Sequence, residues 1–145
     1  MTTQAILERN KDVVRRFFNG THSGQLDVID ETVSPDIVTH GFPGHNPDSL
    51  ASYRAFFESL GNAFANLESD IDDMTAEEDR VDVRFTVRGT HVGEYLGIPA
   101  TGRHVDFTGM VQYRLENSKI AETWLFPDNI TIMQQLGVLP EPEVV

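Results

Sequence analysis

The sequence predicts an α+β fold in which N-terminal helices pack on the concave face of a cone-shaped, curved antiparallel sheet. Three observations predict it. Apolar residues recur at helical spacing through most of the first half of the chain. The second half consists of β-rich segments, several of which alternate between apolar and polar residues. Glycine, proline and asparagine separate these segments. The mouth of such a sheet is a natural site for a small molecule.

Three helices are expected before the main run of strands. The first is capped by Thr3 and ends near Gly20. A second, short helix ends at Ser34-Pro35, because a residue before proline is disfavoured in helical backbone. Asp48 can cap a third helix. Their apolar positions are Ile6, Leu7, Val13, Val14, Phe17 and Phe18, then Leu26, Ile29 and Val33, then Leu50, Tyr53, Phe57, Leu60 and Phe64.

Five strands are expected, over residues 36–41, 67–74, 80–91, 104–115 and 119–126, and a last helix over 129–136 ends at Gly137. Asn117-Ser118 predicts a tight hairpin in which Tyr113 faces Glu122. This pairing gives one apolar face and one mixed face, and the pattern leaves open which of them borders a cavity. The apolar face would carry Val105, Phe107, Val111, Tyr113, Ile120, Trp124 and Phe126, and the mixed face His104, Asp106, Thr108, Met110, Gln112 and Arg114 with Ala121, Thr123 and Leu125.

Length and composition limit the classes of function. The 145 residues predict a single domain with a loose tail over 138–145. The net charge of −12 disfavours nucleic acid and anionic membranes as partners, because phosphate binding needs clustered lysine and arginine. The absence of cysteine excludes disulfides, thiolate nucleophiles and Cys-ligated zinc, and it fits a cytoplasmic protein. No apolar segment is long enough to span a membrane.

Metal and nucleotide chemistry are not favoured by the motifs. The chain has no phosphate-binding loop, no dinucleotide fingerprint and no zinc-protease motif. His104-Val105-Asp106 is the first half of a two-histidine, one-carboxylate iron motif, but no histidine follows it. The acidic stretch 68–82 lacks the spacing of a calcium loop and is expected to be a solvated hairpin. We therefore expect no metal and no cofactor.

Three residues at strand ends could carry chemistry. His40 and His91 each end a predicted strand, where a histidine can also be structural or exposed. Asp128 follows the apolar stretch 124–127 and precedes a predicted helix. As an N-cap, Asp128 would accept backbone hydrogen bonds that lower its pKa, whereas an apolar pocket would raise its pKa toward that of a proton shuttle. Both interpretations remain open at this point.

The sequence resembles the SnoaL-like polyketide cyclases of the nuclear-transport-factor-2-like superfamily over nearly its whole length. The resemblance rests on residues 10–19, which look like the family's first helix, and on 88–103, which look like its long connection between strands. It rests also on Lys119-Ile120-Ala121-Glu122-Thr123-Trp124, Asp128 and Met133-Gln134-Gln135-Leu136-Gly137, which resemble the C-terminal signature. It implies a conical α+β fold that assembles as a homodimer or homotetramer.

The resemblance also implies roles for individual residues. Asp128 matches the family's acid/base, His40 a pocket histidine, and Gln112 a pocket glutamine. Arg114 stands where a cyclase would have histidine, which makes the substrate and the reaction less certain. Gln112 and Arg114 share the mixed face, so that face is expected to line the cavity. Further expected substrate contacts are Arg114, His91, His104, Tyr53 and Trp124.

The function expected from these residues is a cofactor-free aldol cyclase acting on an aromatic polyketide ester. Asp128 would remove a proton from a carbon between two carbonyls, and His40 or Gln112 would donate a hydrogen bond to the developing oxyanion. Two alternatives remain. One is another enzyme on this fold, such as an isomerase, hydratase or cofactor-free hydroxylase, and the other is a non-catalytic binder of a small apolar ligand.

Overall fold

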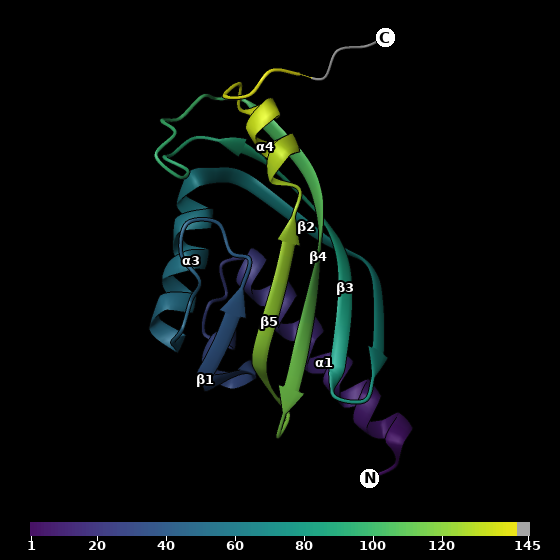
Figure 1. The fold of residues 1–145 in the computed structure, drawn as a ribbon. Helices are drawn as coiled ribbons and strands as arrows, with labels where there is room; N and C mark the ends of the chain where they lie inside the picture. Colours follow the sequence, from purple (N-terminus) through teal and green to yellow (C-terminus); the bar gives the residue numbers. More distant parts are fainter. Residues whose placement is uncertain (142–145) are drawn as a thin grey trace.

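The computed structural model describes residues 1–141 and confirms the α+β fold (Figure 1). Four helices and five strands follow one another along this part of the chain. They are α1 (Thr3–His22), α2 (Val28–Thr32), β1 (Val33–His40), α3 (Leu50–Ala63), β2 (Phe64–Glu77), β3 (Arg80–His91), β4 (His104–Glu116), β5 (Lys119–Pro127) and α4 (Asn129–Gln135).

The five strands form one sheet in the order β1-β5-β4-β3-β2. The prediction of a purely antiparallel sheet is wrong, because β1 pairs with β5 in parallel. Tight turns join β2 to β3 and β4 to β5, and a tight turn requires antiparallel neighbours. β1 and β5 are instead far apart in the chain, so no turn constrains their relative direction. β1 is followed by Gly41, whose positive φ and close approach to the Leu125 carbonyl exclude a side chain.

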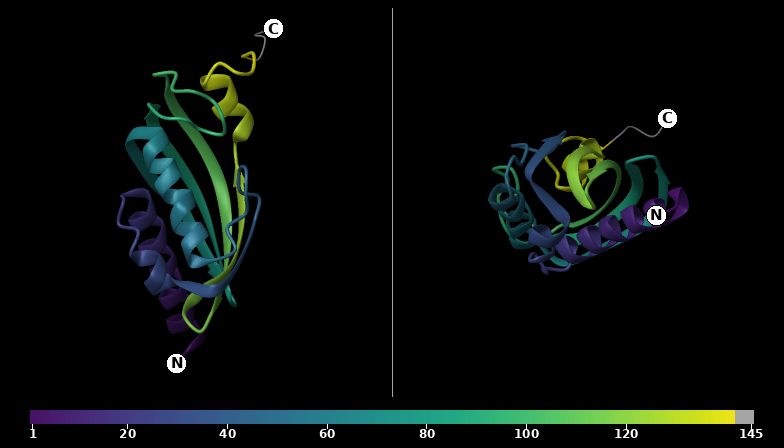
Figure 2. Two further views of the ribbon diagram at one scale, coloured as in Figure 1. Left: turned by 90° about the vertical axis from the view of Figure 1, so that its left-hand side faces the viewer. Right: turned by 90° about the horizontal axis from the view of Figure 1, so that it is seen from below.

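The helices lie on the concave face of this sheet, as the sequence predicts (Figure 2). α1 and α3 cover the sheet from the same side, and the strands bow away from them. The ring of Phe17 from α1 joins the layers, with its centroid 5.3 Å from that of Tyr53 in α3 and 5.9 Å from that of Tyr113 in β4. The core therefore lies between the helices and the inner face of the sheet.

Two helix boundaries differ from the sequence expectation for packing reasons. The helix α1 is capped by Thr2, whose side chain accepts from the Ala5 N–H, and it continues past Gly20 to His22. A side chain at Gly20 would collide with Val28 of α2, so this glycine permits close helix packing and does not end the helix. The third helix is capped by Ser49, and not by Asp48, through a reciprocal bond with Ser52.

The β4–β5 hairpin departs from the predicted register by one residue. Leu115 faces Ile120 as predicted, but Tyr113 faces Thr123 and Gln112 faces Trp124. The extra residue is Ala121, which forms a β-bulge and makes Ile120 and Ala121 two successive buried positions. From Glu122 onward every side chain of β5 therefore lies on the opposite face from the one predicted.

The C-terminal residues expected to form a loose tail are only partly described. Residues 138–141 form bends after α4 without a regular element, and residues 142–145 lie outside the described part of the chain.

Candidate active site

A cavity of about 70 Å³ lies between the helices and the inner face of the sheet. Aromatic side chains from both layers dominate its lining, so the cavity suits a flat, apolar group. The lining residues from the helices and the loop after β1 are Phe17, Phe18, His22, Phe42, Pro43, Tyr53, Phe56, Phe57 and Leu60. Those from the sheet and its connections are Phe85, Val87, Tyr95, Phe107, Val111, Tyr113, Thr123, Leu125, Pro127 and Ile132.

A wider cleft of about 380 Å³ adjoins this cavity on the outside of α3. Pro43, Phe56, Leu60 and Tyr95 line both spaces. The inner cavity alone is smaller than the roughly 300–1,000 Å³ of typical ligand pockets. The outer cleft, by contrast, lies within that range.

His22 is a proton acceptor in the wall of the inner cavity. Its ring stacks on Phe18 at 4.2 Å and meets the edge of Phe57 at 5.3 Å. Burial lowers the pKa of His22 to about 4, which outweighs the raising effect of its bond to the Phe18 carbonyl. The imidazole is therefore neutral at pH 7. Because a carbonyl can only accept, Nδ1 carries the hydrogen in its 2.8 Å bond to Phe18, and Nε2 keeps a free lone pair.

Three residues of the inner cavity's lining, Tyr53, Tyr113 and Thr123, carry hydroxyl groups. Their residues are only 1%, 3% and 1% exposed. Burial raises the pKa of both tyrosines, so both phenols keep their protons at neutral pH. The inner cavity thus combines aromatic walls with three hydroxyl groups and one imidazole.

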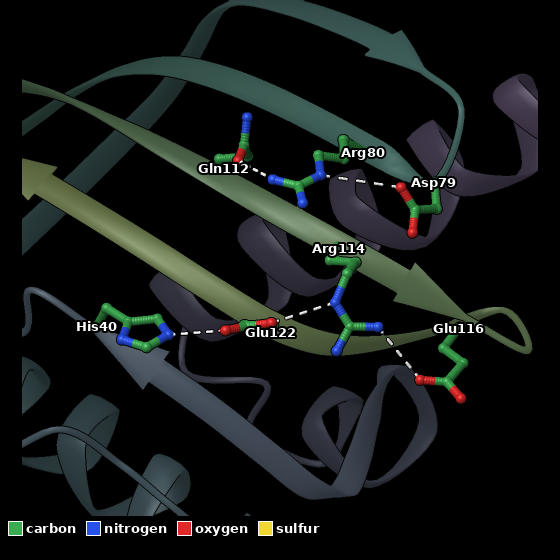
Figure 3. Close-up of polar contacts among 7 residues, drawn as sticks. All are labelled: His40, Asp79, Arg80, Gln112, Arg114, Glu116 and Glu122. Atoms are coloured by element: carbon green, nitrogen blue, oxygen red, sulfur yellow. Dashed lines mark hydrogen bonds and ion pairs between the residues drawn. The ribbon is translucent and has the colours of Figure 1, made fainter.

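Four of the residues singled out from the sequence gather on the outer, convex face of the sheet, and Figure 3 shows three of them, His40, Gln112 and Arg114. His40 Nε2 lies 2.8 Å from Glu122 Oε2, and Arg114 Nε lies 3.2 Å from Glu122 Oε1. Gln112 Oε1 accepts a 2.8 Å hydrogen bond from Arg80. The fourth residue is Trp124. The cavity therefore lies against the opposite face of the hairpin from the one expected to line it, and none of His40, Gln112, Arg114 and Trp124 belongs to its lining.

Two aromatic contacts complete this outer cluster. The ring of His40 stacks on Trp124 with centroids 5.4 Å apart and planes 16° apart. The guanidinium of Arg80 lies 5.1 Å from the Trp124 ring centroid on the same face. The bond from His40, followed by that from Arg114, lowers the pKa of Glu122. The outer cluster is therefore a network of partly exposed ion pairs around one tryptophan.

Asp128 caps α4 at the end of β5. Its carboxylate accepts from the Thr131 N–H at 3.1 Å and from the Thr131 hydroxyl at 2.7 Å. The hydroxyl bond and then the backbone bond lower the pKa of Asp128, so it is ionised at neutral pH. Asp128 is exposed, and the preceding residue, Pro127, lines the inner cavity. Asp128 itself does not belong to the lining of the inner cavity.

The two remaining histidines of the sequence prediction lie apart from these groups. His91 is completely buried, and its Nδ1 accepts from the Thr101 N–H at 3.1 Å and lies 2.9 Å from the Thr101 hydroxyl. These bonds fasten the connection between β3 and β4. His104 is exposed at the start of β4. Of the expected substrate contacts, only Tyr53 lines the inner cavity.

Sequence reasoning did not place His22, Tyr113 and Thr123 in the lining of the cavity. His22 follows the glycine at which the first helix was expected to end. Tyr113 was counted among the apolar core positions, and the predicted register placed Thr123 on the other face. The signal for the correct register was the apolar pair Ile120-Ala121, since two adjacent apolar residues in an alternating strand indicate a bulge.

Searches of the described residues for two other kinds of site gave negative findings. Within residues 1–141, no group of three or more histidine, aspartate or glutamate side chains is arranged to hold a metal ion. None of the helices in this range is both long enough and apolar enough to cross a membrane.

A curved sheet whose inner face and covering helices enclose an aromatic cavity suits a small apolar molecule, and comparison with known proteins identifies the family. The model of the SnoaL-like polyketide cyclases matches residues 4–136. The chain therefore belongs to the SnoaL-like polyketide cyclase family, which confirms the resemblance noted in the sequence. The aklanonic acid methyl ester cyclase DnrD of Streptomyces peucetius is 29% identical over 137 residues, which cover 91% of this chain and 94% of that protein.

Solved structures agree with this family. The crystal structure of a SnoaL-like protein from Jannaschia sp. CCS1, described as a candidate polyketide cyclase, superposes with a TM-score of 0.83 at 26% identity. The match covers 97% of this chain and 99% of the other. AclR of Streptomyces galilaeus, described as a candidate hydroxylase, gives a TM-score of 0.82 at 28% identity, covering 94% and 86%. The fold is thus shared by relatives that are assigned to different reactions.

Proposed function

We propose that this protein closes a ring in an aromatic polyketide ester by an intramolecular aldol reaction. The observation that carries the proposal is the aromatic inner cavity, which opens toward a wider cleft, in a chain of the cyclase family. The name of DnrD states an ester substrate for that relative, and we extend the substrate class to this chain. The proposal includes a cytoplasmic location.

In the proposed reaction, Asp128 is the acid/base. Its carboxylate removes a proton from a substrate carbon between two carbonyls, and the C–H electron pair forms an enolate. The enolate carbon bonds to a second carbonyl carbon, whose oxygen becomes an alkoxide. Asp128 returns the proton to that alkoxide, so the reaction is balanced without a cofactor. The lowered pKa of Asp128 makes it a weak base, which requires a substrate carbon as acidic as this one.

The position of Asp128 supports this role. The carboxylate follows directly on Pro127 of the cavity lining, and a hydrogen bond of 3.1 Å from its own N–H to the Thr108 carbonyl anchors its backbone. A substrate carbon at the rim of the inner cavity would meet a carboxylate that is already ionised. His22 is the alternative base, because its free lone pair lies in the cavity wall.

The test compares Asp128→Asn with His22→Gln in a ring-closure assay. Asparagine caps a helix about as well as aspartate, so Asp128→Asn should fold normally but lose on the order of a hundred-fold to ten-thousand-fold in turnover. Asp128→Ala, by contrast, should lose about 1 kcal/mol of stability through the missing cap. Near-normal turnover of a folded Asp128→Asn protein would remove Asp128 from the mechanism. A large loss in His22→Gln alone would make His22 the base.

We also propose that the protein is a homodimer or homotetramer. Large apolar side chains on the outer face of the sheet support this, with Met110 52% exposed and its strand partner Phe126 66% exposed. Light scattering at micromolar concentration should give a multiple of 16.3 kDa, and a monomer mass would contradict this assembly.

A further inference from the structure

The hydroxyl groups of Tyr53, Tyr113 and Thr123, here called the hydroxyl cluster, come from three different elements of the fold. Tyr53 belongs to α3, Tyr113 to β4 and Thr123 to β5. Tyr113 and Thr123 are direct partners across the hairpin. Both tyrosine rings contact the ring of Phe17 edge-on. The sheet and a helix thus bring these side chains together in an otherwise apolar space.

One member of the hydroxyl cluster, Thr123, lacks a regular hydrogen-bond partner within the described chain. Thr123 Oγ1 is fully buried, and no described residue bonds it. It lies near enough to Tyr53 to lower the pKa of that phenol somewhat, but outside the geometry of a regular hydrogen bond. A buried hydroxyl without a partner costs about 1–3 kcal/mol, and folded proteins leave few of them. The unused bonding capacity of Thr123 therefore points to a ligand atom.

The chemistry of the hydroxyl cluster selects that ligand atom. Both phenols stay protonated at neutral pH, so each can donate one hydrogen bond, and the threonine can donate a third. Several converging O–H donors suit an oxygen with two or more lone pairs. The surrounding aromatic walls suit a flat ring, so the fitting group is the carbonyl of an aryl ketone.

We propose that the hydroxyl cluster binds the carbonyl oxygen of the substrate and stabilises it as an enolate oxygen during ring closure. This inference rests on the proposed function. When the base takes the neighbouring C–H proton, the C–H electron pair forms the new C=C bond. The former carbonyl π pair then moves to the oxygen. Donors that bond this oxygen more strongly as its charge grows lower the barrier, and removing one such donor typically costs about a hundred-fold to a thousand-fold in rate.

Binding of a carbonyl probe tests the hydroxyl cluster without any catalytic step. The probe is 2-acetylnaphthalene labelled with ¹³C at its carbonyl, and the readout is the carbonyl stretching frequency of the bound molecule. Hydrogen-bond donation lowers this frequency. Relative to the natural protein, Tyr53→Phe, Tyr113→Phe and Thr123→Val should each raise it and weaken binding roughly three-fold to ten-fold. Each variant keeps the shape of its side chain, and melting curves establish that it folds.

Tyr95→Phe is the matched control variant, because Tyr95 also lines the cavity but packs on Phe64, outside the hydroxyl cluster. It should leave the frequency unchanged. The matched control ligand, 2-isopropenylnaphthalene, replaces the carbonyl oxygen by a methylene group, and its affinity should be the same in all variants. Equal frequencies in the natural protein and in every folded cluster variant would overturn the inference, as would failure of the ketone to bind.

The inference and the proposed function can fail separately. Asp128→Asn should leave the bound carbonyl frequency at its natural value, since the carboxylate lies outside the cavity lining. In one outcome, the protein closes the ring while the carbonyl frequency of the bound probe is the same in all variants of the hydroxyl cluster. That result would overturn only this inference. A frequency that does depend on it, in a protein that closes no ring, would support carbonyl binding and overturn the cyclase function.

Discussion

The inner and outer faces of the same sheet use polar residues in opposite ways. On the outer face, His40, Arg114 and Glu122 form ion pairs whose side chains are 46%, 28% and 23% exposed. On the inner face, Tyr113 and Thr123 are almost completely buried and make no ion pair. Water screens the first group, whereas the second acts in an apolar space where each hydrogen bond is stronger. Conspicuous charge patterns in a sequence therefore need not mark the site where ligands bind.

Of the substitutions that test the two faces, Phe17→Ala is expected to change the free energy of unfolding most. Phe17 is 1% exposed, and its ring contacts both tyrosines of the hydroxyl cluster. Its removal leaves a cavity beside the existing one and should lower the free energy of unfolding by about 3–5 kcal/mol. Urea denaturation measures this. A loss below about 1 kcal/mol would mean that the inner layer is not the core that holds the sheet to the helices.

A second effect, on the pH dependence of stability, is expected from His22 in the lining of the inner cavity. The pKa of this histidine is about 4 in the folded chain against 6.5 for a free histidine. Between these values the unfolded chain binds a proton that the folded chain does not, so stability rises with pH. As pH falls from 6.5 to 4, His22 should remove up to about 3 kcal/mol of stability.

The measurement is urea unfolding at several pH values in that window, for the natural protein and for His22→Gln. The variant should show a flatter dependence. Glu58 is the acidic residue that lines a separate surface cleft together with His22, and it is the same in both proteins. An equal slope in His22→Gln would show that His22 is not held neutral by burial.

The smallest effect is expected on the outer face, from Glu122→Gln. This change removes the charge that pairs with His40 and Arg114 but keeps the shape of the side chain. Exposed ion pairs contribute about 0–1 kcal/mol, so the melting temperature should change little, and the change should shrink further in high salt. A loss above about 2 kcal/mol that persists in high salt would show that the outer cluster is a structural element of the fold.

Much of the fold could be predicted from the sequence, because its elements follow local rules. The apolar residues from Ile6 to Phe18 recur at helical spacing and predict α1. The alternation over residues 80–91 predicts β3 with its exact bounds. The parallel partner of β1 could not be predicted, since it depends on a contact between segments that no turn connects. The family resemblance could be recognised because each of its segments is a short run of residues, and the match of the family model over residues 4–136 confirms it.

The composition of the candidate site could be predicted less well, since it depends on which face each strand residue occupies. Tyr53 lines the inner cavity because its apolar helical stripe faces the sheet, and its role as a substrate contact stays a prediction. Thr123 and Trp124 were assigned to the wrong faces by a register that lacked one bulge. A single residue with no chemistry of its own thus decided the placement of a buried hydroxyl and of an indole.

The bulge at Ala121 therefore decides how β5 responds to a change in its length. Beyond the bulge, successive side chains alternate between the face that meets the helices and the outer face. Deleting Ala121 would remove the bulge but leave Ile120 opposite Leu115 and Glu122 opposite Arg114, so Thr123 would still face the helices and Trp124 the outside. Deleting both Ala121 and Glu122 would instead place Trp124 opposite Tyr113, which puts an indole on the inner face where a hydroxyl now lies. In this part of the chain, the bulge therefore absorbs the loss of one residue, whereas the loss of two changes the cavity's chemistry although no lining residue has been altered.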